Sequence, residues 1–240
     1  MQEPRYYQLY SSGTDQKDVA EILEWFSLRE GDSQANDILL LNYFNEIPIC
    51  FAATIDSVDR GVVEMTTHKT QLIAMLDQKI TFLKSDSLQH SVFAKVQRVD
   101  LGKNKVFISN FSYVLIRSMR REHLRVKPKN ILDVGFECDE FSVRGFLYDI
   151  SIGGLSILTT DQADAEIGVQ GTVGLYLAGT KQKVPCRLLK VLDTDNSKKY
   201  VFIFDLNPKI EMLISQFICQ IQNETIRELK DRIESLEIMQ

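Results

Sequence analysis

Short strand-like segments fall into two groups along this 240-residue chain, and this pattern constrains the fold more than any other feature. In both groups, apolar and β-branched runs are separated by turn-forming clusters such as Asp59-Arg60-Gly61. Candidate strands lie at residues 49–55, 62–66, 79–83, 92–99 and 105–111, and then at residues 135–138, 143–148, 155–159, 173–177, 184–192 and 200–206. Strands this short and numerous predict a mainly β protein of the α+β class, built from two small β-barrel domains, the second with six strands.

Helical periodicity precedes and interrupts the first group. Thr14 or Asp15 can cap a helix whose face carries Val19, Ile22, Leu23 and Phe26. Residues 33–45 fit a second short helix, although their apolar cluster could also begin a strand, and residues 70–77 fit a short helix. We therefore expect an N-terminal domain over residues 1–115 with leading helices, a second domain over residues 116–208, and a C-terminal helix over residues 209–240.

The C-terminal segment has a long apolar face. From Pro208 onward the face carries Ile210, Leu213, Ile214, Phe217, Ile218 and Ile221, and a narrower stripe continues it through Ile226, Leu229, Ile233 and Leu236. The first half fits packing on a barrel, whereas the stripe extends beyond what a small barrel could shield. Because an exposed stripe usually marks a contact, we expect a homodimer to which residues 222–240 contribute.

Composition excludes several classes of protein. No apolar run approaches the roughly 20 residues that a membrane span needs, and the N-terminus lacks the layout of a signal peptide, so we expect a cytoplasmic protein without membrane insertion. The four cysteines are far apart, and His68, His90 and His123 are too scattered for a zinc site. We expect reduced thiols, no metal and no cofactor.

The charge of the chain is unevenly distributed. The formal net charge is −5, but residues 117–129 carry six Arg and Lys residues against Glu122 alone. A general nucleic-acid-binding protein would present a broad basic face. One basic strip in an otherwise acidic chain indicates instead a local anion site, and we expect the strip to be an extended linker between the two domains.

Two short motifs gain their meaning from each other. Arg121 and Arg125 form Arg-x-x-x-Arg with Arg120 in front, and residues 149–154 read Asp-Ile-Ser-Ile-Gly-Gly. Taken alone, the second motif is a hairpin connection, because Asp, Ser and Gly form turns. Taken alone, the arginines are a solvated basic cluster. Arg121 and Arg125 precede Asp149 by 28 and 24 residues. The two motifs in this order and at this spacing are a more specific signal than either motif alone.

Together these motifs resemble the two-part signature of PilZ domains, the receptors for the bacterial second messenger cyclic di-GMP. The resemblance implies a ligand site made of Arg120, Arg121, Arg125, Asp149, Ser151, Gly153 and Gly154. In relatives with Arg at the position of Arg120, that side chain helps to hold two stacked ligand molecules, which implies two ligands per chain. The layout of an N-terminal β-domain, a basic hinge, a barrel and a C-terminal helix is similar to that of YcgR-type flagellar brake proteins.

The chemistry of the motif residues fits this ligand. A guanidinium can bind guanine O6 and N7, or a phosphate, through two parallel hydrogen bonds, and it can stack on a purine. A carboxylate complements the N–H donors of guanine, and Ser151 adds a hydroxyl. Gly153 and Gly154 allow positive φ or a close approach of the backbone to the ligand.

The sequence therefore indicates a receptor and not an enzyme, since it carries no P-loop, no dinucleotide fingerprint and no clustered metal ligands. We expect the ligand to order residues 117–129, to rotate the N-terminal domain, and to regulate the flagellar motor or a related surface behaviour through a protein partner. Two alternatives remain open. One is a nucleic-acid-binding β-barrel that uses the basic strip, and the other is a PilZ adaptor that acts without ligand.

Overall fold

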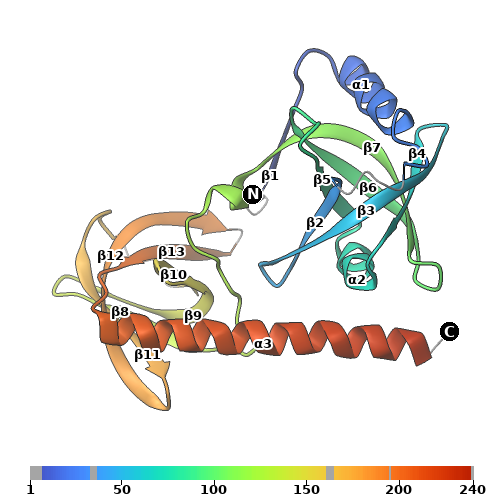
Figure 1. Ribbon diagram of the computed structural model, residues 1–240. Coiled ribbons are helices and arrows are strands. Elements are labelled where there is room, and N and C mark those ends of the chain that lie inside the picture. Colours follow the sequence, from blue (N-terminus) through green and yellow to red (C-terminus); the bar gives the residue numbers. More distant parts are fainter. Residues whose placement is uncertain (1–6, 33–36, 161–164, 195, 239–240) are drawn as a thin grey trace. The chain divides into compact units, whose positions relative to one another are not determined.

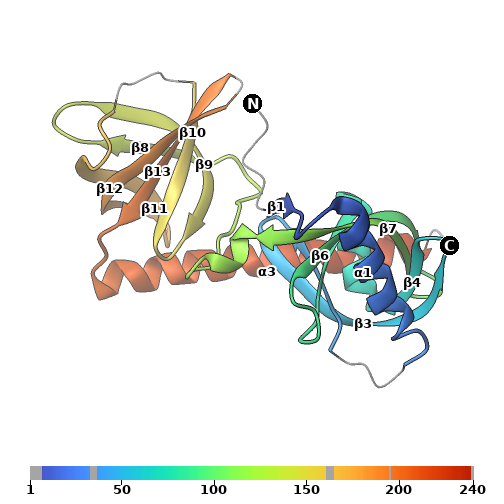
Figure 2. The same cartoon turned by 90° about the horizontal axis from the view of Figure 1, so that it is seen from above.

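The computed structural model describes residues 7–32, 37–160, 165–194 and 196–238, which divide into two compact units (Figure 1). The first unit contains the described chain before residue 122, apart from the turn 45–47, and the residues from Ile226 onward. The second unit contains residues 122–225 together with the turn 45–47. Each unit contains a β-barrel of its own (Figures 1 and 2). No helix among the described residues has the length and apolar character needed to cross a membrane.

The first barrel is a closed ring of six antiparallel strands. Its order is β7-β4-β3-β2-β5-β6, and pairing of β6 with β7 closes it. The bounds are β2 Leu39–Phe44, β3 Ile47–Asp59, β4 Val62–Thr67, β5 Ile80–Lys84, β6 Ser91–Asp100 and β7 Lys105–Ile116. A further strand, β1 Tyr7–Tyr10, pairs with the end of β7.

Two helices belong to this barrel. The helix α1 (Asp15–Ser27) begins at Thr14, whose side chain accepts a hydrogen bond from the Lys17 amide, and it buries Ile22 and Phe26 completely. The helix α2 (Lys69–Gln78) lies between β4 and β5 in the chain and ends at Lys79, which has a left-handed φ of 57°. Both helices were predicted from the sequence, α1 from its apolar spacing, and both predictions are confirmed.

The second barrel is also closed, in the order β10-β13-β12-β11-β8-β9. Its strands are β8 Asp133–Glu137, β9 Ser142–Ser151, β10 Gly154–Thr159, β11 Gln170–Leu177, β12 Thr180–Thr194 and β13 Ser197–Phe204. Tyr200, Phe136 and Phe202 are among its largest fully buried side chains. All six candidate strands of this group are confirmed, and so is the mainly β, two-barrel fold.

The proposed second helix at residues 33–45 is wrong where the structure describes it. Residues 39–44 form β2, as the alternative reading allowed, and they pair with β5. The buried Asn42 side chain donates to the Ile80 carbonyl at 2.7 Å and to Gln78 at 2.8 Å. These contacts between distant residues decide the local structure, because a short apolar run fits a buried strand as well as a helix.

The C-terminal helix α3 spans Pro208–Ile238 without a break. Ile214, Ile218 and Ile221 are buried in the core of the second unit. In the other unit, Leu229 is only 3% exposed and packs with Phe44, Ile49, Ile73 and Ala74. The expectation that the stripe lies exposed is therefore wrong at Leu229, while Ile226 is 43% exposed and the side chain of Leu236 lies outside the described residues.

Replacing Leu229 with Ala should lower the free energy of unfolding of the first unit by about 2–4 kcal/mol, because it leaves a cavity among buried apolar side chains. Trp25, the single tryptophan, lies in α1 of this unit, so its fluorescence during urea unfolding measures the effect directly. Ile226→Ala is the matched control and should cost less than about 1 kcal/mol, since Ile226 is already largely exposed. Equal losses in both variants would mean that Leu229 does not anchor the helix.

Candidate functional site

The second motif is the connection between β9 and β10. Ser151 pairs with Gly154 in the antiparallel register, so Ile152 and Gly153 form the turn. The Ser151 hydroxyl donates to the Gly154 carbonyl at 3.3 Å, and the Phe204 amide donates to the Gly153 carbonyl at 3.1 Å. The hairpin reading of this motif is correct, and these bonds fix the turn against β13.

The basic strip is joined to the same hairpin by a two-way backbone bridge. The Val126 amide donates to the Ile150 carbonyl at 2.8 Å, and the Ile150 amide donates to the Val126 carbonyl at 3.0 Å. The Val126 side chain is fully buried in the barrel core. The strip is therefore not a free linker along its whole length, because it is anchored at Val126.

This bridge places Arg125 beside Asp149. An Arg125 guanidinium nitrogen lies 3.9 Å from one carboxylate oxygen of Asp149. Asp149 is 5% exposed and Ser151 is 7% exposed. A carboxylate buried to this extent needs charged or hydrogen-bonding partners, and the strip supplies one of them. The structure thus brings Arg125, Asp149 and Ser151 together from segments that are about two dozen residues apart.

A second cation, Lys199 on β13, also holds Asp149. Its ammonium donates to the other carboxylate oxygen at 3.1 Å and lies 3.5 Å from the centre of the Tyr148 ring. Burial lowers the pKa of Lys199 below its ordinary value, although the negative charge of Asp149 acts in the opposite direction. The ammonium of Lys127 lies over the same ring at 4.4 Å. Asp149, Tyr148 and these cations form one charged cluster.

Sequence reasoning missed Lys199. Fifty positions separate it from Asp149 in the chain, and no motif joins the two residues. The local signal is weak: Lys198 and Lys199 directly precede the buried run 200–202 of β13. A lysine beside buried positions is usually paired, so this position indicated that Lys199 has a charged partner, without showing which residue it is.

The two glycines act differently from the expectation. Neither Gly153 nor Gly154 is among the described residues with positive φ, so of the two alternatives only the close approach remains. A Cβ on Gly154 would lie 2.1 Å from the Phe202 carbonyl oxygen. A Cβ on Gly153 would lie 2.8 Å from Cδ2 of His123, which belongs to the basic strip. In the structure the close approach is made by the protein chain itself. Gly154 leaves room for the neighbouring strand β13, and Gly153 leaves room for the side chain of His123.

The remaining arginines lie at the start of the strip. Arg117–Arg120 form a short 3-10 turn, and Arg121 is partly buried just after it. The side chain of Arg120 lies outside the described residues, so its proposed role is untested. Among the described residues, no group of three His, Cys, Asp or Glu side chains is arranged to hold a metal ion.

Comparison with known proteins gives one family. Residues 119–220 match the family model described as "PilZ domain". No curated protein sequence matches the chain. Among solved structures, YcgR of Escherichia coli in complex with c-di-GMP is 15% identical, with 97% of this chain and 99% of that chain covered and a TM-score of 0.43.

Two other solved structures also match. The MrkH–c-di-GMP complex of K. pneumonia is 13% identical over 92% of this chain and 99% of that chain, with a TM-score of 0.45. The inhibitor of motility MotI/DgrA of Bacillus subtilis is 10% identical over 79% of this chain and 97% of that chain, with a TM-score of 0.41.

Proposed function

Because residues 119–220 form a domain of the PilZ family, we propose that this protein is a cytoplasmic receptor for cyclic di-GMP. The observation that carries the proposal is the backbone bridge between Val126 and Ile150. It brings Arg125 of the first motif to Asp149 and Ser151 of the second, so that cations and a hydrogen-bonding carboxylate lie together on one edge of the barrel.

The cluster suits a ligand that carries both phosphate and guanine. Guanidinium groups bind phosphate or the O6 and N7 atoms of guanine, whereas Asp149 can accept from guanine N–H groups. In the structure Asp149 is held by Arg125 at 3.9 Å and by Lys199 at 3.1 Å. Each carboxylate oxygen has more than one lone pair, so Asp149 can accept from guanine while Lys199 keeps it in place.

Titration calorimetry of the full chain with cyclic di-GMP tests this proposal. We expect saturable binding that persists when excess GMP is present, because GMP offers one guanine and one phosphate in place of two of each. Affinity that falls steeply with salt and does not depend on guanine would support the nucleic-acid alternative instead. Absence of binding at high ligand concentration would leave the ligand-independent adaptor.

We further propose two ligand molecules per chain, on the basis of Arg120. Its position directly before Arg121 suits contact with a second guanine, as the resemblance implies. Wild-type protein should titrate with two equivalents, and Arg120→Ala should shift the stoichiometry toward one. Arg117→Ala is the matched control in the same 3-10 turn and should keep two equivalents. A wild-type titration that ends at one equivalent contradicts the role of Arg120.

The proposed output is a change in the arrangement of the two units, read by a protein partner that controls motility or a related surface behaviour. Residues 117–125 precede the anchor at Val126, and the units divide in the chain between residues 121 and 122. Like charges in this segment repel one another until the ligand neutralises them. Amide hydrogen exchange should therefore slow in residues 117–125 when ligand is added, while Val126 and Ile150 are protected throughout. Unchanged exchange would mean a preformed site.

A further inference from the structure

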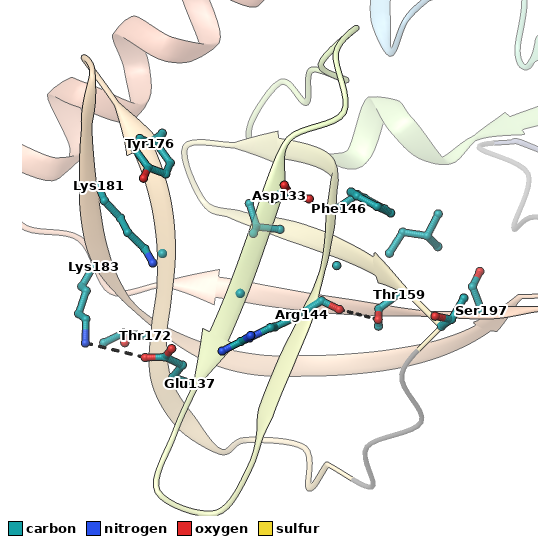
Figure 3. Close-up of a pocket in the computed structure, with 16 residues that line it drawn as sticks. Asp133, Glu137, Arg144, Phe146, Thr159, Thr172, Tyr176, Lys181, Lys183 and Ser197 are labelled. Carbon is teal, nitrogen blue, oxygen red and sulfur yellow. Dashed lines mark hydrogen bonds and ion pairs between the residues drawn. The ribbon is translucent and has the colours of Figure 1, made fainter.

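A groove of about 920 Å³ lies on the second barrel, away from the motif residues. Its lining comes mainly from β8, β9, β11 and β12, and no residue of either motif is part of it. Figure 3 shows Lys181 and Lys183 on one side of the groove, Phe146 on the other, and Arg144 between them. Nothing in the proposed reception of cyclic di-GMP uses this surface.

Glycines form the floor of the groove. In the strand register Gly135 of β8 lies opposite Gly174 of β11, and these two are flanked by Arg144 on β9 and Lys183 on β12. This row crosses four adjacent strands and is therefore about 14 Å long. A Cβ on Gly135 would lie 3.8 Å from Cγ of Arg144, and a Cβ on Gly174 would lie 2.9 Å from Cε of Lys181. The glycines thus leave room for the stems of two cationic side chains to lie along the floor.

Aromatic side chains stand beside this floor. Phe146 is 48% exposed and Tyr176 is 69% exposed, and both line the groove. They lie on strands β9 and β11, two residues along from Arg144 and Gly174 respectively. Large exposed aromatic rings beside a recess are typical of surfaces that anchor a partner's apolar side chain.

The charges in the groove favour an anion. Lys183 is paired with Glu137 at 3.8 Å, whereas no carboxylate in the described parts of the chain lies within ion-pairing distance of Arg144 or Lys181. Asp133 is the other acidic residue in the lining, so the cations are in excess. This excess stands out because the chain as a whole carries a net charge of −5.

We propose that this groove binds a short extended segment of a partner protein in which a carboxylate side chain lies close to an aromatic or large aliphatic one. Arg144 and Lys181 would bind the carboxylate, and the apolar side chain would lie against Phe146 and its cross-strand neighbour Leu158, because Asp133 on β8 lies on the other side of Phe146, toward β11. About four extended residues span the row of strands. The segment cannot bind by adding a strand to the sheet, because the barrel is closed and these strands are paired on both sides. With Asp133 and Glu137 counted, the lining has an excess of one positive charge, which suits a single carboxylate better than the row of phosphates of a nucleic acid.

The test uses an array of labelled seven-residue peptides on the full-length protein. Each peptide places Phe, Tyr or Leu at its centre and Asp or Glu two to four residues away, and a matched set carries Asn or Gln in place of the acids. We expect binding by members of the acidic set and at least about fivefold weaker binding by their amide counterparts, measured by fluorescence anisotropy. The double variant Arg144→Glu, Lys181→Glu should lose binding, whereas Lys190→Glu, an exposed charge reversal on β12 outside the lining, should keep it.

A filling variant separates the groove from general electrostatic attraction. A Cβ at Gly135 has an ordinary nearest contact of 3.5 Å, and β-branched residues favour strands, so we expect Gly135→Val to fold and to block the floor; its thermal melt checks the fold. Loss of peptide binding in this variant supports the proposal. It is overturned if no acidic peptide binds better than its amide counterpart, or if Gly135→Val binds as well as wild type. It is also overturned if oligothymidylate displaces the labelled peptide from the groove. The same holds if the protein self-associates through these residues at high concentration when no peptide is present.

Discussion

Replacing Arg125 with Ala is expected to weaken the binding of cyclic di-GMP by at least about tenfold. A hydrogen bond to a charged group contributes about 1.5–3 kcal/mol, and about 1.4 kcal/mol corresponds to a tenfold change in affinity. Arg125 is also next to the anchored Val126 and lies 3.9 Å from Asp149, so it is already positioned before the ligand arrives. Calorimetry on the wild-type and variant proteins measures the effect.

Asp149 needs a more careful variant. Truncation to Ala would remove the carboxylate that holds the largely buried ammonium of Lys199, and the loss of one partner of a buried pair is strongly destabilising. Asp149→Asn keeps the shape and the acceptor oxygen but removes the charge, so its loss of affinity is a better measure of the contact with ligand. Arg187→Ala, an exposed arginine on β12, is the control and should bind as wild type does. Wild-type affinity in the Arg125→Ala protein contradicts the proposed site.

The sequence predicted most of the strands because their signals are local. Alternation and turn residues define β3 to β13, and each candidate strand is confirmed within a few residues. The strand β1 was missed because Tyr7–Tyr10 is short and gains its structure from pairing with the distant end of β7. The segment 39–44 was ambiguous for a similar reason: its partner, β5, lies about forty residues away.

The candidate site was predictable only in part. The motifs name Arg125, Asp149 and Ser151, and the bridge at Val126 explains why residues so far apart in the chain meet. Lys199 was not predictable from the motifs, because its contact with Asp149 exists only after β13 is placed in the barrel. The burial of Leu229 could not be predicted from the sequence either, because the side chains that bury it, Phe44, Ile49 and Ile73, come from three separate elements.

Gly154 is expected to have the largest effect on stability of any single residue in the site. A Cβ added there would lie 2.1 Å from the carbonyl oxygen of Phe202 and 3.2 Å from Cα of Ile203. Both neighbours are backbone atoms of β13, which is held in a closed barrel by β10 on one side and β12 on the other. The strands can separate only by breaking their hydrogen bonds, so Gly154→Ala should lower the free energy of unfolding of the second unit by about 3 kcal/mol or more.

Two neighbouring glycines provide the comparison. Gly153→Ala meets His123, a side chain on the strip that can move, so it should cost less stability while displacing His123 from the turn. Gly135→Ala has only an ordinary contact at 3.5 Å and should be nearly neutral. Far-UV circular dichroism during urea unfolding follows both units, and Trp25 fluorescence follows the first unit alone. The Gly154→Ala protein should show an early loss of dichroism with a largely unchanged tryptophan transition. Near-wild-type stability of both units would mean that β10 and β13 can part at this point, and that Gly154 is required by the ligand instead of by the fold.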